Sequence, residues 1–307
     1  MRLTLNKQSN VKVKKRKESS VLTPWLFLLP ALLMISVFYI YPILQAFMWS
    51  VQDYKIIAGE GAFVGLDNFR YIFQDSLFWR ALTNSLLFLV VVLPLNVFLP
   101  IIVASAVNQK VKGIGLFRVI YYSPVVTPMV VAALMWRMLY VESGFVGNLV
   151  HFLGLYDRPT NLLMQTSTAL FAVTVITVWK GLGYYMMIYL AGLQSISDEV
   201  YEAASIDGAS PIQKFFKITV PMLAPSITLV SIMTIINGLK VFEEIALTTG
   251  GGPAGATTTL VIYIFDKFRN LEVSTASAAG IVLLVLAATG SVIQLKLNSG
   301  KEKDLKG

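Results

Sequence analysis

The 307-residue chain has no cysteine and a single histidine. Without cysteine there can be no disulfide, thiolate metal site or cysteine nucleophile. The histidine, His151, lies in a stretch expected to be a polar loop, and we assign it no role. Charge is also scarce, because only 14% of the residues are charged, against about 25% in soluble domains. Hydrophobic residues make up 56% of the chain, which indicates a membrane protein.

The hydrophobic residues gather in long runs. Each run reaches the roughly 20 residues that a helix needs to cross a ~30 Å hydrocarbon layer. The runs cover residues 25–49, 83–107, 119–140, 167–193, 222–242 and 275–295. The sequence therefore predicts an all-α, polytopic membrane protein with six transmembrane helices, held within residues 21–298.

The net charge of +8 is concentrated near the two ends of the chain. Seven of the 25 Lys and Arg residues lie within residues 2–17, and four follow Leu295. Basic tails beside membrane spans are what the positive-inside rule produces. We therefore expect the tails 1–20 and 299–307 in the cytoplasm, and no nucleic-acid partner. Two cytoplasmic ends require an even number of spans.

The connecting segments agree with this orientation. Residues 108–118 are basic and are expected inside, whereas residues 141–166 carry one cation, Arg158, and are expected outside. The 195–221 segment is then cytoplasmic and the 243–274 loop external.

Residues 250–255 read GGGPAG, which contains the G-x-G-x-x-G spacing of a dinucleotide-binding turn. That motif requires a buried strand before it and a soluble helix after it, whereas this stretch joins two predicted spans outside the membrane. A phosphate-binding loop would also need a lysine where Ala256 stands. We expect a tight turn, because glycine tolerates positive φ and proline fixes its own φ. The chain itself is not expected to bind a nucleotide.

The cytoplasmic segment has helix signals that a simple connection would not need. Ser195 precedes Asp198 by three residues, which predicts a capping box. Gly208 predicts the end of that helix in a left-handed cap, and Ser210 with Pro211 predicts the start of a second helix. We expect two short helices joined by a sharp turn.

This segment resembles the EAA loop of binding-protein-dependent ABC importer permeases, whose pattern is E-A-A-x-x-x-G, nine residues, then I-x-L-P. The pattern falls here on Glu202, Ala203, Ala204, Gly208, Ile218 and Pro221, with Val220 in place of leucine. Other stretches are similar to the carbohydrate branch of this family, which includes the maltose, lactose, multiple-sugar and glycerol-phosphate permeases. They are FVGLDNFRYIF (63–73), YYSPVVTPMVVAALMWRMLY (121–140), GLGYYMMIYLAGLQSI (181–196) and LTTGGGPAGATTTLVIYIF (247–265).

The resemblance implies the type I importer permease fold, with both termini cytoplasmic, in a prokaryotic plasma membrane. It implies that the chain catalyses nothing and binds no cofactor, while two cytoplasmic ATPase subunits bind ATP and Mg. A second, related permease and an extracellular solute-binding protein would complete the assembly. The residues that the resemblance assigns to ATPase coupling are Glu202, Ala203, Ala204, Asp207 and Gly208.

Polar residues inside the predicted spans mark a candidate substrate pathway. Lys180 lies near the middle of the 167–193 run, where a lysine costs about 2.5–3.5 kcal/mol on insertion scales. A sugar needs hydrogen-bonding groups and aromatic faces, and such groups are supplied by Asn96, Thr177, Trp179, Lys180, Tyr184, Thr234 and Asn237. The alternative is that these residues hold the spans together, with Lys180 paired to an acid of a partner.

Three charged residues, Lys240, Glu243 and Glu244, lie near the outer end of the fifth run. Their i, i+3 and i, i+4 spacing predicts an ion pair at the membrane interface.

We therefore expect a permease subunit of an ATP-driven importer that takes up a carbohydrate, an oligosaccharide in particular. One alternative keeps this architecture but carries glycerol phosphate or another acidic substrate, because Lys180 can oppose an anion. The other alternative is a secondary transporter driven by an ion gradient. Against it, the chain shows no internal repeat and no mid-span carboxylate. A channel or scaffold would give no reason for the ordered cytoplasmic segment.

Overall fold

The computed structural model describes residues 22–109 and 111–304. The chain divides into two units, the first ending at Gln45 and the second beginning at Ala46. The described part of the first unit contains α1 (Leu22–Ile35), the π-helical turn η1 (Ser36–Ile40) and the start of α2 (Tyr41–Ser50). Together these form an apolar helix, Pro24–Ser50, long enough to cross a membrane. It corresponds to the predicted first span. The predicted basic tail 1–20 lies outside the described residues.

The second unit is mostly helical, as predicted, and opens with a two-stranded hairpin that the sequence did not predict. Its strands β1 (Gln52–Lys55) and β2 (Glu60–Phe63) are antiparallel, with Gln52 opposite Phe63. The helices are α3 (Asp67–Gln74), α4 (Ser76–Val107), α5 (Ile114–Val126), α6 (Met129–Tyr140), α7 (Phe145–Phe152), η2 (Leu162–Met164), α8 (Ala169–Gln194), α9 (Asp198–Ile206), α10 (Pro211–Lys214), η3 (Phe215–Thr219), α11 (Val220–Met222), α12 (Ala224–Leu239), α13 (Glu243–Thr248), α14 (Leu260–Arg269) and α15 (Val273–Asp304).

The predicted third span, 119–140, is not one helix. It is broken between α5 and α6, where Thr127 adopts an extended conformation with φ −72° and ψ 125°. Pro128 explains the break, because a proline disfavours helical backbone at the residue before it and has no N–H to donate. The prediction of a continuous third span is therefore wrong.

The predicted fifth span, 222–242, is also shorter than expected. The helix α12 covers only Ala224–Leu239 and is bent by 69° from the Pro211–Met222 segment before it. Pro225, which lies in the first turn of α12, cannot donate a backbone hydrogen bond across the bend. Within the described residues, five helices are long and apolar enough to cross a membrane, or six if the bent pair is one span.

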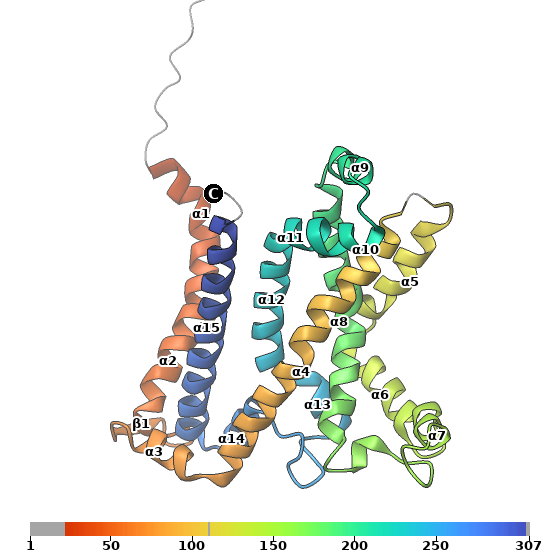
Figure 1. The fold of residues 1–307 in the computed structure, drawn as a ribbon. Helices are drawn as coiled ribbons and strands as arrows, with labels where there is room; N and C mark the ends of the chain where they lie inside the picture. The colour runs from red at the N-terminus through yellow and green to blue at the C-terminus, as the bar shows by residue number, and fades with distance from the viewer. Residues whose placement is uncertain (1–21, 110, 305–307) are drawn as a thin grey trace, which may run out of the picture. The chain divides into compact units, whose positions relative to one another are not determined.

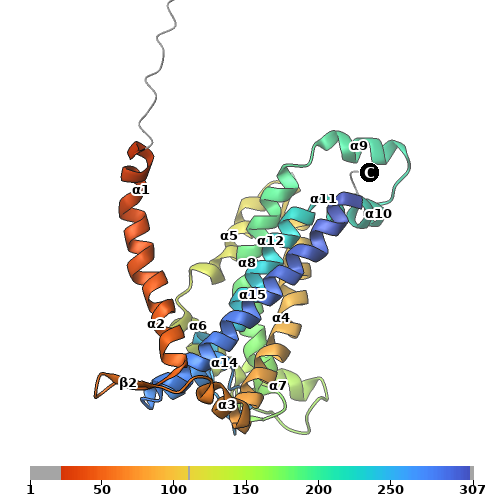
Figure 2. The ribbon, with the colours of Figure 1, turned by 90° about the vertical axis from the view of Figure 1, so that its left-hand side faces the viewer.

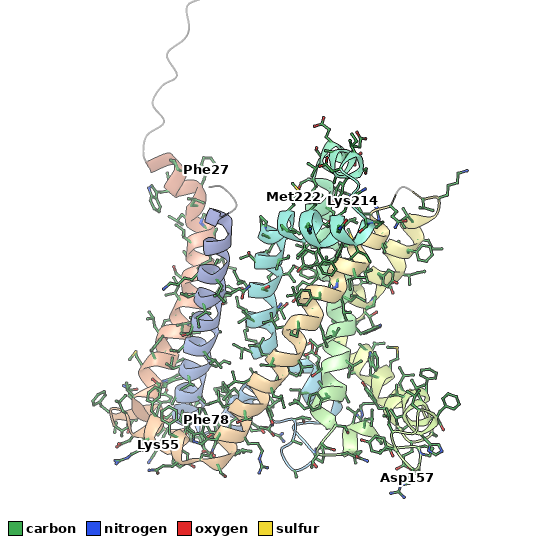
Figure 3. All side chains as sticks on the ribbon, viewed as in Figure 1. Phe27, Lys55, Phe78, Asp157, Lys214 and Met222 are labelled. Atoms are coloured by element: carbon green, nitrogen blue, oxygen red, sulfur yellow. The ribbon has the colours of Figure 1, made fainter. Side chains whose placement is uncertain are left out.

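Helices α4, α8 and α12 form the centre of the second unit (Figures 1 and 2). The pair α9 and α10 lies at one end of this unit, together with the C-terminal end of α15. The helices α13 and α14 lie toward the opposite end. In Figure 3 the labelled Lys214 marks the first end, and Lys55 and Asp157 mark the other. This agrees with the predicted alternation of the connecting segments. Helix α15 continues to Asp304, through most of the predicted tail 299–307.

The segment 243–274, which was predicted to be an external loop, is more ordered than a loop, since it holds α13 and α14. Between them, Gly250, Gly251 and Gly255 adopt positive φ, so the predicted tight turn at GGGPAG is confirmed. Two side chains of α4 hold this turn. Arg80 Nη1 donates to the Ala254 carbonyl over 2.7 Å, and Asn84 Nδ2 donates to the carbonyls of Gly255 and Thr258.

A charged cluster fixes α14 beside α3 and the start of α4. The Tyr263 hydroxyl donates to Asp75 Oδ2 over 2.8 Å, and Lys267 Nζ lies 2.8 Å from Glu272 Oε2 and 3.9 Å from Asp75 Oδ2. Burial lowers the pKa of Lys267, but the hydrogen bond to Glu272 and the nearby acids outweigh it, so the pKa is raised. The Lys267 ammonium also lies over the rings of Tyr71 and Tyr263.

The close packing of α8 against α5 depends on Gly183, and this can be tested. A Cβ at this position would collide with the backbone carbonyl oxygen of Tyr121. We expect Gly183→Ala to lower the free energy of unfolding by about 1–3 kcal/mol, as overpacked cores do, measured by thermal unfolding in detergent. Gly280→Ala in α15 is the matched control, because nothing lies within 4 Å of a Cβ there. Equal behaviour of the two variants would contradict this account of the packing.

Candidate functional site

A cavity with several polar residues in its lining lies among the central helices of the second unit. Its volume is about 270 Å³. Helix α8 contributes the largest share of its lining, and α4, α5, α12 and α13 contribute the rest. The lining residues are Val92, Asn96, Val125, Thr177, Lys180, Gly181, Tyr184, Tyr185, Thr234, Asn237, Gly238 and Glu244.

Helical spacing explains why these residues meet. On α8, Thr177, Lys180, Gly181 and Tyr184 stand at i, i+3, i+4 and i+7, which places them on one face. A Cβ on Gly181 would lie 3.2 Å from Asn96 Oδ1. The missing side chain at this position therefore lets the Asn96 amide approach α8.

Several polar atoms in this lining have no protein partner. Asn96 Oδ1, Thr177 Oγ1 and Thr234 Oγ1 are buried and accept or donate no hydrogen bond within the described residues. Buried polar groups are nearly always hydrogen-bonded, and those that are not require an explanation. Three of the six such atoms in the described residues belong to residues that line this cavity.

The Lys180 ammonium has a partner of a kind that the sequence did not reveal. Its Nζ donates to the backbone carbonyl of Thr127 over 2.6 Å. Thr127 is the C-cap residue of α5. The lysine therefore donates to a carbonyl at the break before Pro128, within the predicted third span. This bond links two predicted spans within this chain at the wall of the cavity, and a contact between Lys180 and the substrate stays a prediction.

Glu244 is the charged lining residue that sequence reasoning missed. Its spacing from Lys240 predicted an ion pair at the interface, but α12 ends before Lys240 and a new helix begins at Glu243, which turns the Glu244 side chain to the cavity. Burial raises the pKa of the Glu244 carboxyl; Lys180 acts in the opposite direction, with a smaller effect. The only available sequence signal was a pair of acidic residues, which is typical of a helix start.

The structure brings together six of the seven side chains proposed for the substrate pathway. The exception is Trp179, which does not line this cavity. Its ring packs edge-to-face on Trp136, with centroids 5.7 Å apart, beside the apolar cluster of α6 and α8. Helical geometry accounts for this, because Trp179 lies next to Lys180 and therefore points about 100° away from it.

The second candidate site is the pair of short helices α9 and α10. Gly208 follows the end of α9 with φ +75°, the left-handed conformation that the sequence predicted. Ser210 and Gln213 form a complete capping box at the start of α10. The predicted capping box at Ser195 is wrong, because Ser195 follows the last residue of α8 and donates its hydroxyl to the Gly192 carbonyl.

The residues that the resemblance assigned to coupling lie mostly on the outer surface of this pair. Glu202, Ala203, Asp207 and Gly208 are exposed, and Ala204 is turned inward and buried. Ile206, beside the turn, is 87% exposed.

Two hydrogen bonds join α9 to the helical segment Pro211–Met222, which leads to α12. The Tyr201 and Thr219 hydroxyls share a hydrogen bond of 3.0 Å, and Lys214 Nζ donates to Ser205 Oγ over 2.6 Å. Thr219 ends the π-helical turn η3 (Phe215–Thr219), and such turns are frequent at functional sites. The helix pair is therefore one connected body.

The Tyr201–Thr219 bond provides a test of that connection. We expect Tyr201→Phe and Thr219→Val each to lower the free energy of unfolding by about 0.5–1.5 kcal/mol, the usual worth of one such bond. The double variant should lose no more than either single variant, because the same bond is removed once. Thr219→Ser keeps the hydroxyl and is the matched control. Additive losses in thermal unfolding would show that the two hydroxyls act independently.

Known proteins resemble this chain over most of its length. Residues 80–302 match the family described as binding-protein-dependent transport system inner membrane component. The probable ABC transporter permease protein YurN of Bacillus subtilis is 35% identical and aligns with 91% of this chain and 97% of its own. The lactose transport system permease protein LacF of Rhizobium radiobacter is 34% identical, covering 88% and 92%.

A solved structure agrees with these relatives. It is a bacterial ABC transporter involved in the import of the acidic polysaccharide alginate, and one of its chains aligns with a TM-score of 0.78 at 25% identity. The alignment covers 90% of this chain and 94% of that chain.

Proposed function

Since the chain belongs to the binding-protein-dependent transport system inner membrane components, in their carbohydrate branch, we propose that it is one permease subunit of an ATP-driven importer for a carbohydrate, an oligosaccharide in particular. It is a multi-pass protein of the plasma membrane. Its substrate would be delivered by an extracellular solute-binding protein. The other partners are a second, related permease and two cytoplasmic ATPase subunits that bind ATP and Mg.

The observation that carries the proposal is the helix pair α9 and α10. Its exposed Glu202, Ala203, Asp207 and Gly208 form the surface on which an ATPase subunit docks, while Ala204 packs inward. The pair follows α8 and leads into α12, so a rigid-body movement of the pair is passed to two spans. Rigid-body movement of this kind is a common form of switching. This movement would open the substrate pathway alternately to the outside and to the inside of the membrane.

The cavity supports passage of a hydroxyl-rich substrate. Asn96, Thr177 and Thr234 line it and each has a side-chain oxygen without a partner in the described residues, Tyr184 supplies an aromatic ring, and Asn237 a further amide. Its volume of about 270 Å³ is below the ~300–1,000 Å³ of sites that enclose a small ligand. An oligosaccharide therefore needs a second wall, which the companion permease would supply.

Gly208 tests the docking role. Valine in the left-handed region costs about 1–2 kcal/mol, which we expect to distort the turn between α9 and α10. Gly208→Val should leave the assembled complex in the membrane but reduce the sugar imported per ATP hydrolysed by about tenfold, measured in proteoliposomes. Gly113→Val is the matched control, because Gly113 also has positive φ and open space around it, between α4 and α5. Full coupling in the Gly208 variant would refute the docking role.

The unpartnered hydroxyls test the passage role. Thr234→Val removes a hydroxyl that bonds nothing in the described structure, so the free energy of unfolding should be unchanged or higher. Uptake should nevertheless fall by about three- to tenfold, the effect of one lost neutral hydrogen bond to a substrate. Thr174→Val is the matched control, because the Thr174 hydroxyl donates to Leu170 within α8 and does not line the cavity. Equal uptake in both variants would return Thr234 to a purely structural role.

A further inference from the structure

We propose that the cavity accepts an uncharged carbohydrate, and that Glu244 is the residue that disfavours an acidic one. This rests on the proposed function and decides a question that the family leaves open. One similar permease is named for lactose, which is neutral, and one similar structure imports alginate, which is acidic. Membership of the family therefore does not fix the charge of the substrate.

The charge inventory of the cavity is balanced. Lys180 is its one cation and Glu244 its one carboxyl, and the other ten lining residues are amides, hydroxyls, phenols or apolar groups. A site for a carboxylate or phosphate is usually built from arginines, several lysines or backbone N–H groups directed at the anion. No second cation lines this cavity in the described part of the chain.

One of the three N–H donors of this single cation is already engaged. Lys180 Nζ donates to the Thr127 carbonyl at 2.6 Å, and a lysine has three donors in total. An acidic substrate at Lys180 would lie in the same small cavity as the Glu244 carboxyl, where like charges repel strongly because the dielectric constant is low.

Glu244 itself reports how the cavity treats negative charge. Burial raises the pKa of its carboxyl even though the Lys180 ammonium acts to lower it. Taking a substrate carboxylate out of water costs free energy as it does for Glu244, and Glu244 adds repulsion in the fraction of molecules in which it is ionised. The unpartnered Asn96 Oδ1 and the threonine hydroxyls instead suit sugar hydroxyls, which both donate and accept.

The first test uses the complete importer, with its own ATPases, companion permease and binding protein, in proteoliposomes. The probes are neutral di- to hexasaccharides and the matching uronate-containing oligosaccharides, and the readout is stimulated ATP hydrolysis together with uptake. Neutral saccharides should stimulate both, and acidic ones should not. Stimulation by acidic saccharides alone would overturn the charge inference and leave the importer function standing. No stimulation by any saccharide would overturn both the charge inference and the importer function.

The second test changes the charge balance. Glu244→Gln leaves Lys180 unbalanced, so uptake of the neutral substrate should fall by about tenfold, and uptake of the matching uronate should rise to a measurable level. The double variant Lys180→Met/Glu244→Gln removes both charges and should discriminate against the uronate again. Glu244→Asp keeps the carboxylate and should keep the wild-type selectivity, which guards against a folding defect.

Glu243→Gln is the matched control for these variants. Glu243 is the neighbouring acid at the start of α13, but it is exposed and does not line the cavity. Its removal should leave the selectivity unchanged. An equal shift in the Glu243 and Glu244 variants, or no shift in either, would show that the cavity carboxyl does not select by charge.

Discussion

A half-buried ammonium within a membrane span needs a partner, and the break in the third span supplies one for Lys180. An unpaired polar or charged group away from water is costly, and within a membrane the backbone must also satisfy itself. The break before Pro128 frees the Thr127 carbonyl, and Lys180 donates to it. Two local defects, a proline in one span and a lysine in another, therefore stabilise each other. The cavity that Lys180 lines lies beside this bond.

The same reasoning separates what the sequence could predict from what it could not. The run lengths predicted membrane helices, and the signals around Gly208 and Ser210 predicted the turn and the second short helix, because these depend on local chemistry. The face shared by Thr177, Lys180 and Tyr184 followed from helical period alone. Those features are confirmed in the fold, and the roles given to these residues stay predictions.

The incorrect predictions concern features that depend on packing between segments far apart in the sequence. Pro94 and Pro100 lie inside the continuous helix α4, yet Pro128 ends α5, and no local signal separates these cases. Prolines in membrane helices are tolerated when neighbouring helices satisfy the freed backbone groups, so the outcome depends on packing. Glu244 was misplaced for the same reason. Its side chain reaches the cavity only because the chain turns between α12 and α13.

Connectivity joins the two candidate sites more directly than any chain of contacts. The segment that contains α9 and α10 begins where α8 ends and finishes where α12 begins. Helices α8 and α12 supply eight of the twelve residues that line the cavity, five from α8 and three from α12. The Tyr201–Thr219 hydrogen bond ties α9 to the segment Pro211–Met222 before α12. A force on the helix pair therefore acts on both α8 and α12. A movement of α8 relative to α12 would change the shape of the cavity between them, which is how an ATPase subunit docked on the helix pair, as proposed, would control access.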